Sequence, residues 1–125
     1  MIQISGIAEV NAAIRRVSGA LHPGGEMSRA VEWMTLAALR GVKARTDVDT
    51  GAYRAGQTSE MQNALTGRVF IDPSARNPRS RVPVVVYGPI EEARGGTHAA
   101  YQRTYSEQGG AIVNEAGNML VRAFP

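Results

Sequence analysis

Hydrophobic positions recur at helical spacing near the start of the chain. From about Ser5 to Leu21, the apolar side chains step three, four, three and four residues apart, which is the narrow seam of an amphipathic helix. The seam consists of Ile7, Val10, Ile14, Val17 and Leu21. Such a seam can lie in a groove of its own domain or against a neighbouring subunit, and the residues leave both open. The His-Pro-Gly-Gly run at 22–25 then ends the segment.

A second, longer helix is predicted from Glu26 to Arg45. An acidic residue lies in its first turn and basic residues lie in its last two turns, as the helix macrodipole favours. Its apolar face is formed by Met27, Ala30, Val31, Met34, Ala38 and Val42, and it is widened by Trp33, Leu36 and Leu39. We expect this helix to be the scaffold of the fold.

A turn follows over residues 45–54. The aspartates and β-branched residues of this stretch oppose helix continuation, and Gly51 can adopt positive φ without a Cβ clash. Residues 52–66 carry no clear periodicity. Within them, residues 57–65 could form one short helix, capped by Thr58 or Ser59, or a polar loop.

Two strands are predicted in the middle of the chain. One is Arg68–Asp72, and the other is Val82–Tyr87, with Pro83 at its start or edge. The residues between them, 73–81, form a hairpin loop rich in proline, serine and arginine. The loop is longer than a hairpin needs. We therefore predict that its arginines, Arg76, Arg79 and Arg81, contact something outside the domain.

Two further helices are predicted after the strands. Thr97 caps the first, which runs to Gln108 and ends at the two glycines 109 and 110, and the last helix runs from Ala111 to Phe124. The predicted fold class is α+β, with a small antiparallel sheet packed against a long helix and a C-terminal helix, and with an N-terminal helix. Residues 1–125 are predicted to be a single domain, divided into an N-terminal helix (1–22) that can dock on a neighbour and an α+β core (26–125).

Composition narrows the function classes. The chain has no cysteine, which excludes disulfides, thiolate nucleophiles and cysteine-ligated zinc. We expect no signal peptide, and no apolar run approaches the roughly 18 residues of a membrane span. The net charge is +3, and Lys43 is the only lysine among 14 basic residues. Eleven acidic residues are interleaved with these bases, so a face for duplex DNA is not indicated.

Candidate chemistry is sparse. His22 and His98 lie far apart and outside any metal-binding pattern, and Asp47 and Asp49 lack the remaining ligands of a calcium loop. No serine lies in a nucleophile motif, and we predict no cofactor and no enzymatic activity. One arrangement could in principle cleave RNA by general acid–base chemistry, although an amphipathic helix explains most of the same residues. It comprises Arg94, His98, Tyr101, Arg103 and Tyr105.

Two short motifs resemble those of a known family. Val48-Asp49-Thr50-Gly51, followed after two residues by Arg54, resembles the Pro-Val-Asp-Thr-Gly-Arg-Leu-Arg signature of the tail-completion (neck) proteins of tailed phages. Residues 87–92 resemble the family's Tyr-Ala-Pro-Tyr-Val-Glu segment at Tyr87, Pro89 and Glu92, and that segment follows a strand in the family. The chain departs from the family where Asp47 replaces a proline, where Ala52-Tyr53 replaces Arg-Leu and where Ile90-Glu91 replaces Tyr-Val. The resemblance extends loosely from Glu26 to Phe124.

The resemblance implies a structural virion protein. Such a subunit forms a ring, most often a hexamer, between the connector or stopper and the tail tube or terminator, and DNA passes through its lumen without sequence-specific binding. It implies a location in the virion neck after assembly in the host cytoplasm, with no membrane partner. The interface candidates are Asp49, Thr50, Gly51, Arg54, Tyr87, Pro89 and Glu92. The alternative is a small basic nucleic-acid-binding protein or a toxin-like ribonuclease that uses His98 and the nearby arginines.

Overall fold

A computed structural model describes residues 6–46 and 51–123 of the chain. The elements in chain order are α1 (Ile7–Leu21), α2 (Glu26–Arg45), α3 (Ala52–Ala55), β1 (Gln57–Asn63), β2 (Thr66–Ile71), α4 (Val84–Ala93), the 3-10 turn η1 (Gly96–His98) and α5 (Ala100–Ala123). The protein is therefore α+β, as predicted: a two-stranded antiparallel sheet packs against long helices, and an N-terminal helix precedes them.

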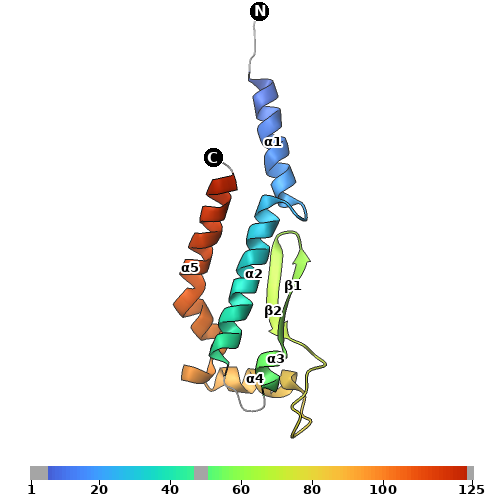
Figure 1. Ribbon diagram of the computed structural model, residues 1–125, viewed down its shortest axis with the longest axis vertical. Coiled ribbons are helices and arrows are strands. Elements are labelled where there is room, and N and C mark those ends of the chain that lie inside the picture. The colour runs from blue at the N-terminus through green and yellow to red at the C-terminus, as the bar shows by residue number, and fades with distance from the viewer. Residues whose placement is uncertain (1–5, 47–50, 124–125) are drawn as a thin grey trace, which may run out of the picture.

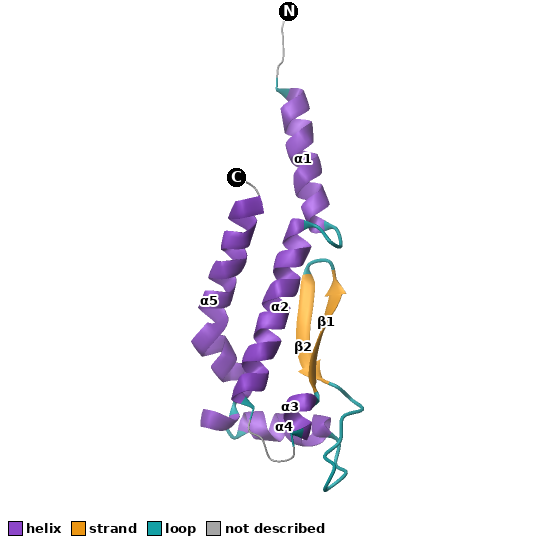
Figure 2. Cartoon of the chain, in the orientation of Figure 1, coloured by secondary structure: helices purple, strands orange, loops and turns teal. Residues whose placement is uncertain are grey.

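Helix α2 lies at the centre of the molecule. Figure 1 shows α5 along one side of α2 and the β1–β2 hairpin along the other, while α4 crosses beneath them. Helix α1 extends beyond the N-terminal end of α2 and away from the sheet. The predicted bounds of α2 are confirmed, and α1 begins within two residues of the predicted start. The colouring in Figure 2 shows how small the sheet is beside the helices.

Glycine and small polar side chains allow the close packing around α2. A Cβ atom on Gly41 of α2 would overlap Thr104 and Gln108 of α5, and a Cβ atom on Gly67 of β2 would overlap Thr35 of α2. Thr35 and Thr104 each turn the hydroxyl back to a carbonyl one turn earlier in their own helix, which satisfies these buried polar groups. Both neighbours of α2 therefore approach it closely, because no large side chain separates them.

The first strand of the hairpin corrects one prediction. Residues 57–65 form neither a short helix nor a loop, because Gln57–Asn63 pairs with β2 in a register from Gln57↔Ile71 to Met61↔Gly67. The sequence hides this strand because its exposed positions are polar. Gln57 is buried, and its amide Nε2 donates a 2.7 Å hydrogen bond to Thr46 Oγ1. The predicted strand Arg68–Asp72 is confirmed as β2, which starts two residues earlier and ends one residue earlier than predicted.

The predicted strand Val82–Tyr87 is wrong, because Val84–Ala93 is helix α4 with Pro83 at its N-cap. The run of valines has the composition of a buried strand, but the valines differ in their exposure to solvent. Val84 is fully buried, whereas Val85 and Val86 are exposed. Val84 and Gly88, four residues apart, form the buried stripe of a short helix. Residues 73–81 consequently connect β2 to α4, rather than two strands.

The two predicted C-terminal helices are one helix. Helix α5 begins at Ala100, after η1, so Thr97 does not cap it, and it continues through Gly109 and Gly110 to Ala123. Each glycine within a helix costs about 1 kcal/mol relative to alanine. Helix α5 packs along α2 and buries Ala100, Thr104 and Ala116, and this packing outweighs the cost and keeps the helix continuous.

The close approach at Gly41 yields the first prediction. Gly41→Val should lower the free energy of unfolding by about 2 to 3 kcal/mol, because its side chain has no space against Thr104 and Gln108. The control is Gly117→Ala in α5, where the added Cβ meets nothing within 4 Å. That change should raise the free energy of unfolding by about 0.5 to 1 kcal/mol. Urea titrations measure both, and equal stability of Gly41→Val and the wild type would contradict the packing account.

Candidate functional site

The first motif lies at the corner after α2. Asp49 and Thr50 fall outside the described residues. Gly51 has φ 83°, the left-handed conformation that the sequence predicted, and it directly precedes α3. Arg54 donates from Nη2 to the carbonyl oxygen of Thr46 at 3.2 Å. Thr46 in turn donates its hydroxyl to Val42 O at 2.7 Å, so the corner is tied to the end of α2.

The second motif lies inside α4 rather than after a strand. It nevertheless meets the first motif through two tyrosines. The rings of Tyr53 and Tyr87 are 6.1 Å apart between centroids, in an edge-to-face arrangement. Tyr53 is buried, and its hydroxyl donates to Gly88 O at 3.3 Å. Two segments that are more than 30 residues apart in the chain therefore form one contact, which we call the motif junction (residues 51–54 and 87–92).

Glu92 connects the motif junction to α5. Its two carboxylate oxygens accept hydrogen bonds from the backbone N–H groups of Tyr101 at 3.1 Å and Gln102 at 2.9 Å. These N–H groups belong to the first turn of α5, where no carbonyl of the same helix can accept them, and where a negative charge is favourable. Arg54, Tyr87 and Glu92 thus have contacts within the subunit, whereas Pro89 is exposed on α4. Their predicted role at an interface stays a prediction.

The arginine loop comprises residues 73–81. Its shape is that of a hairpin, closed by an antiparallel bridge between Arg76 and Pro83. Asn77 Oδ1 accepts from the N–H groups of Arg79 and Ser80, and Arg76 Nη1 donates to Arg81 O at 3.3 Å. Arg76, Arg79 and Arg81 are all exposed. Figure 1 places this loop at the end of the molecule opposite α1.

The residues of the possible ribonuclease cluster are spread around an ion-paired network. Glu91 Oε2 lies 3.1 Å from Arg94 Nη1 and 3.5 Å from His98 Nδ1. Arg103 is held by Glu107 at 3.3 Å. Tyr105 is 81% exposed, whereas the hydroxyl of Tyr101 is buried. The two arginines that would bind a phosphate group, Arg94 and Arg103, therefore already form ion pairs with carboxylates.

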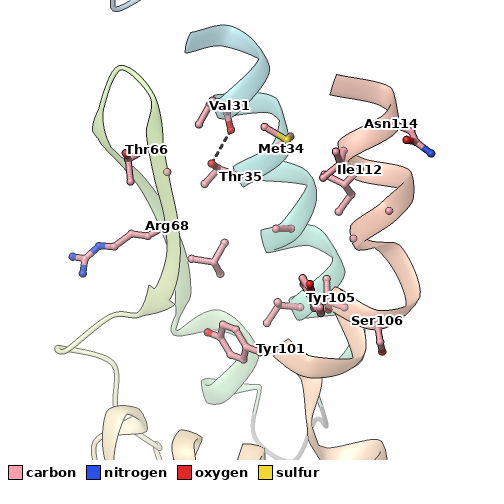
Figure 3. A pocket seen from close by; sticks show the side chains of 18 of the residues that line it. Val31, Met34, Thr35, Thr66, Arg68, Tyr101, Tyr105, Ser106, Ile112 and Asn114 are labelled. Carbon is pink, nitrogen blue, oxygen red and sulfur yellow. Dashed lines mark hydrogen bonds between the residues drawn. The ribbon is translucent and has the colours of Figure 1, made fainter. Parts of the chain in front are cut away.

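An open groove runs along α2 between β2 and α5. It encloses about 920 Å³, and its lining is predominantly apolar. Figure 3 shows α2 as its floor, with the hairpin on one side and α5 on the other. Residues that line the floor are Val31, Met34, Thr35, Ala38 and Val42. Tyr101, Gly109, Gly110 and Ile112 line the α5 side. The sequence predicted the apolar face of α2 as core, but nothing in it indicated that part of this face stays open.

The seam predicted on α1 faces solvent. Val10, Ile14 and Val17 are each more than half exposed, and Leu21 is 42% exposed. We call these four residues the α1 stripe. The sequence left two positions open for the seam, a groove of its own domain or a neighbouring subunit. In this structure the seam does not lie in a groove of its own domain. The stripe lies on a helix that projects from the body (Figure 1).

Ionisation of the tyrosines is coupled to folding. Burial raises the pKa of Tyr53 to about 12, with a further contribution from Tyr101, Glu92 and Glu91. Burial, together with Glu92, also raises the pKa of Tyr101 to about 12. Among the acids, the hydrogen bonds from Ser74 lower the pKa of Asp72, and the hydrogen bond from Arg45 lowers that of Glu107.

Within residues 6–46 and 51–123, no three histidine or acidic side chains come together as a metal site would require. In the same ranges, every helix is too short or too polar to cross a membrane. The chain matches no family model, no curated protein and no solved structure.

The motif junction yields a pH-dependent prediction. An unfolded tyrosine has a pKa near 10, so the folded state of Tyr53, with a pKa of about 12, binds its proton more tightly. The resulting stability is fully present below pH 10 and is lost as the pH rises through 12. We expect the free energy of unfolding to fall by on the order of 2 kcal/mol over that interval because of Tyr53.

Urea unfolding at pH 9, 10.5 and 12 measures this dependence. Tyr53→Phe should remove about half of the dependence, since phenylalanine does not ionise and Tyr101, whose pKa is also raised to about 12, keeps its own contribution. Tyr105→Phe is the matched control, because Tyr105 is 81% exposed, and this variant should keep the wild-type dependence. Parallel curves for Tyr53→Phe and the wild type would show that Tyr53 is not buried in solution.

Proposed function

We propose that this protein is a structural subunit that assembles with copies of itself. One observation supports the proposal: most of the buried hydrophobic residues are small, and many large hydrophobic residues are exposed to solvent. Five of the eight buried hydrophobic residues among those described are alanine. Thirteen large hydrophobic residues in the same ranges are at least 37% exposed. A chain that leaves so much aliphatic surface in water is typical of a protein that buries it against a partner.

The exposed aliphatic residues are grouped by element. The α1 stripe is one group, and a second lies on α4 at Val85, Val86 and Ile90. Burying the half-exposed side chains of the stripe contributes on the order of 4 kcal/mol. Association of two proteins costs at least about that much in lost freedom of motion. A single contact of this size therefore gives a weak dimer, and a closed ring, in which each subunit makes two contacts, is favoured.

We propose the phage neck as the setting of this ring. The long helix, the left-handed turn at Gly51 and Arg54 occur in the order of the family signature. In this reading the subunit forms a ring, most often a hexamer, between the connector or stopper and the tail tube or terminator. The arginine loop lies at the end of the molecule opposite α1, which suits contact with an adjacent ring. Interleaved charges of both signs suit a lumen that DNA traverses without adhering.

The mass of the purified protein in solution tests the proposal. It should be measured by light scattering at low and moderate salt, with and without a short RNA. One chain has a mass of 13.4 kDa, so a six-membered ring would have a mass of about 80 kDa (6 × 13.4). We expect a concentration-dependent assembly that persists in moderate salt, because its contacts are apolar, and that ignores RNA.

Two variants sharpen this measurement. Ile14→Asp places a charge in the α1 stripe and should return the protein to 13.4 kDa. Ala12→Asp places the same charge on the opposite side of α1 and should leave the assembly intact. A monomer at every concentration would contradict self-assembly. A monomer that binds RNA and releases it in moderate salt would favour the nucleic-acid-binding alternative instead.

A further inference from the structure

The α1 stripe is held outside the groove of its own subunit. Ala20 is buried at the corner between α1 and α2, and the carbonyl oxygens of Gly19 and Ala20 occupy the position that a Cβ atom on Gly25 would take. Arg16 Nη2 donates to Ala123 O at 3.0 Å, which ties α1 to the end of α5. Folding α1 back over its own α2 would break all three contacts. In this structure the stripe is therefore not covered by the groove of its own subunit.

The groove is apolar, like the α1 stripe, and is long enough for two turns of it. From Val10 to Leu21 the stripe spans eleven residue steps, or about 16 Å of helix. The accessible groove floor runs from Val31 to Ala38, which is seven steps or about 10 Å, because Val42 beyond it is buried. Apolar side chains form this floor apart from Thr35, and Gly110 on the α5 side, where an added Cβ atom would meet nothing within 4 Å, leaves room for side chains of an incoming helix.

We propose that the α1 stripe of one copy docks in the α2–β2–α5 groove of the next copy. This inference rests on the proposed self-assembly and names the two surfaces that it uses. The contact is head-to-tail, because the stripe and the groove are different surfaces of the same chain. Every subunit inserts its own α1 into one neighbour and binds the α1 of another neighbour in its groove. Such a contact generates a ring if the rotation between successive subunits adds up to a full turn.

The size of the contact explains why a ring is favoured over a dimer. A helix of 15 residues is about 22 Å long and about 10 Å across, so it presents roughly 350 Å² when half embedded. A stable pairwise interface needs about 800 Å² from each partner. One docked helix falls short of this area. In a closed ring every subunit makes two such contacts, so a subunit can leave only when both contacts break together.

Disulfide cross-linking between copies tests the docking directly, because the chain has no native cysteine. Val17→Cys places a thiol in the α1 stripe, and Ala38→Cys places one on the groove floor. The two variants are mixed at a concentration where the wild type assembles and are then oxidised. We expect a covalent pair of about 27 kDa (2 × 13.4) that contains one chain of each variant.

Matched variants control for chance collisions. Ala12→Cys lies on the opposite side of α1, and Ala44→Cys is exposed on α2 outside the groove. Mixtures in which either control replaces its counterpart should give at least tenfold less covalent pair. The pair Ile14→Cys and Met34→Cys probes the same contact by a second route, in case Ala38→Cys perturbs the groove.

Each other outcome overturns the docking in a different way. Cross-linking of Val17→Cys to itself, in preference to Ala38→Cys, would show that α1 helices pair with each other. An internal disulfide in the double variant Val17→Cys/Ala38→Cys would show that α1 folds into its own groove. Normal assembly without the mixed pairs would overturn this inference and leave the proposed function standing. A wild type that never assembles would overturn both.

Discussion

The close approach of α2 to both of its neighbours is the constraint on which the structure depends. Gly41 brings α5 against one side of α2, and Gly67 brings the hairpin against Thr35 on the other. These contacts need small residues, so the buried core is built mainly from alanine, threonine and glycine. The motif junction completes the arrangement at the lower end of the molecule. There, Tyr53 packs on α4, and Glu92 fixes the start of α5.

This way of packing determines where the large apolar side chains go. Because the layers meet through small residues, many larger ones are left at the surface, above all on α1, α4 and α5. The same packing leaves the floor of the groove open between β2 and α5 (Figure 3). A projecting apolar helix and an open apolar groove on one chain are complementary surfaces. The head-to-tail assembly that we propose would bury these two surfaces against each other.

The sequence predicted the elements whose hydrophobic period is unambiguous. Helix α2, the helix α1 with its seam and the strand β2 are confirmed, and so is the α+β class. Prediction failed where tertiary contacts override local preference. The valines of α4 locally favour a strand, but the burial of Val84 and Gly88 on one side stabilises a helix. The two glycines of α5 locally favour a helix break, but packing against α2 keeps the helix continuous. Among the candidate site residues, sequence located Gly51 at a turn, whereas Arg54, predicted in the same turn, lies in the short helix α3. The sequence could not reveal that Glu92 caps α5, because that contact joins two helices across a loop.

Hydrogen–deuterium exchange as a function of protein concentration tests the central claim, that α1 is an assembly surface, most directly. In an isolated subunit, α1 is a projecting helix of 15 residues with exposed apolar side chains, and its amides should exchange quickly. At high concentration, we expect exchange in α1 and in the groove-lining part of β2 to slow together, while the arginine loop stays unchanged. Identical exchange in α1 at low and high concentration, in a sample whose mass increases, would contradict the account, because assembly would then use another surface.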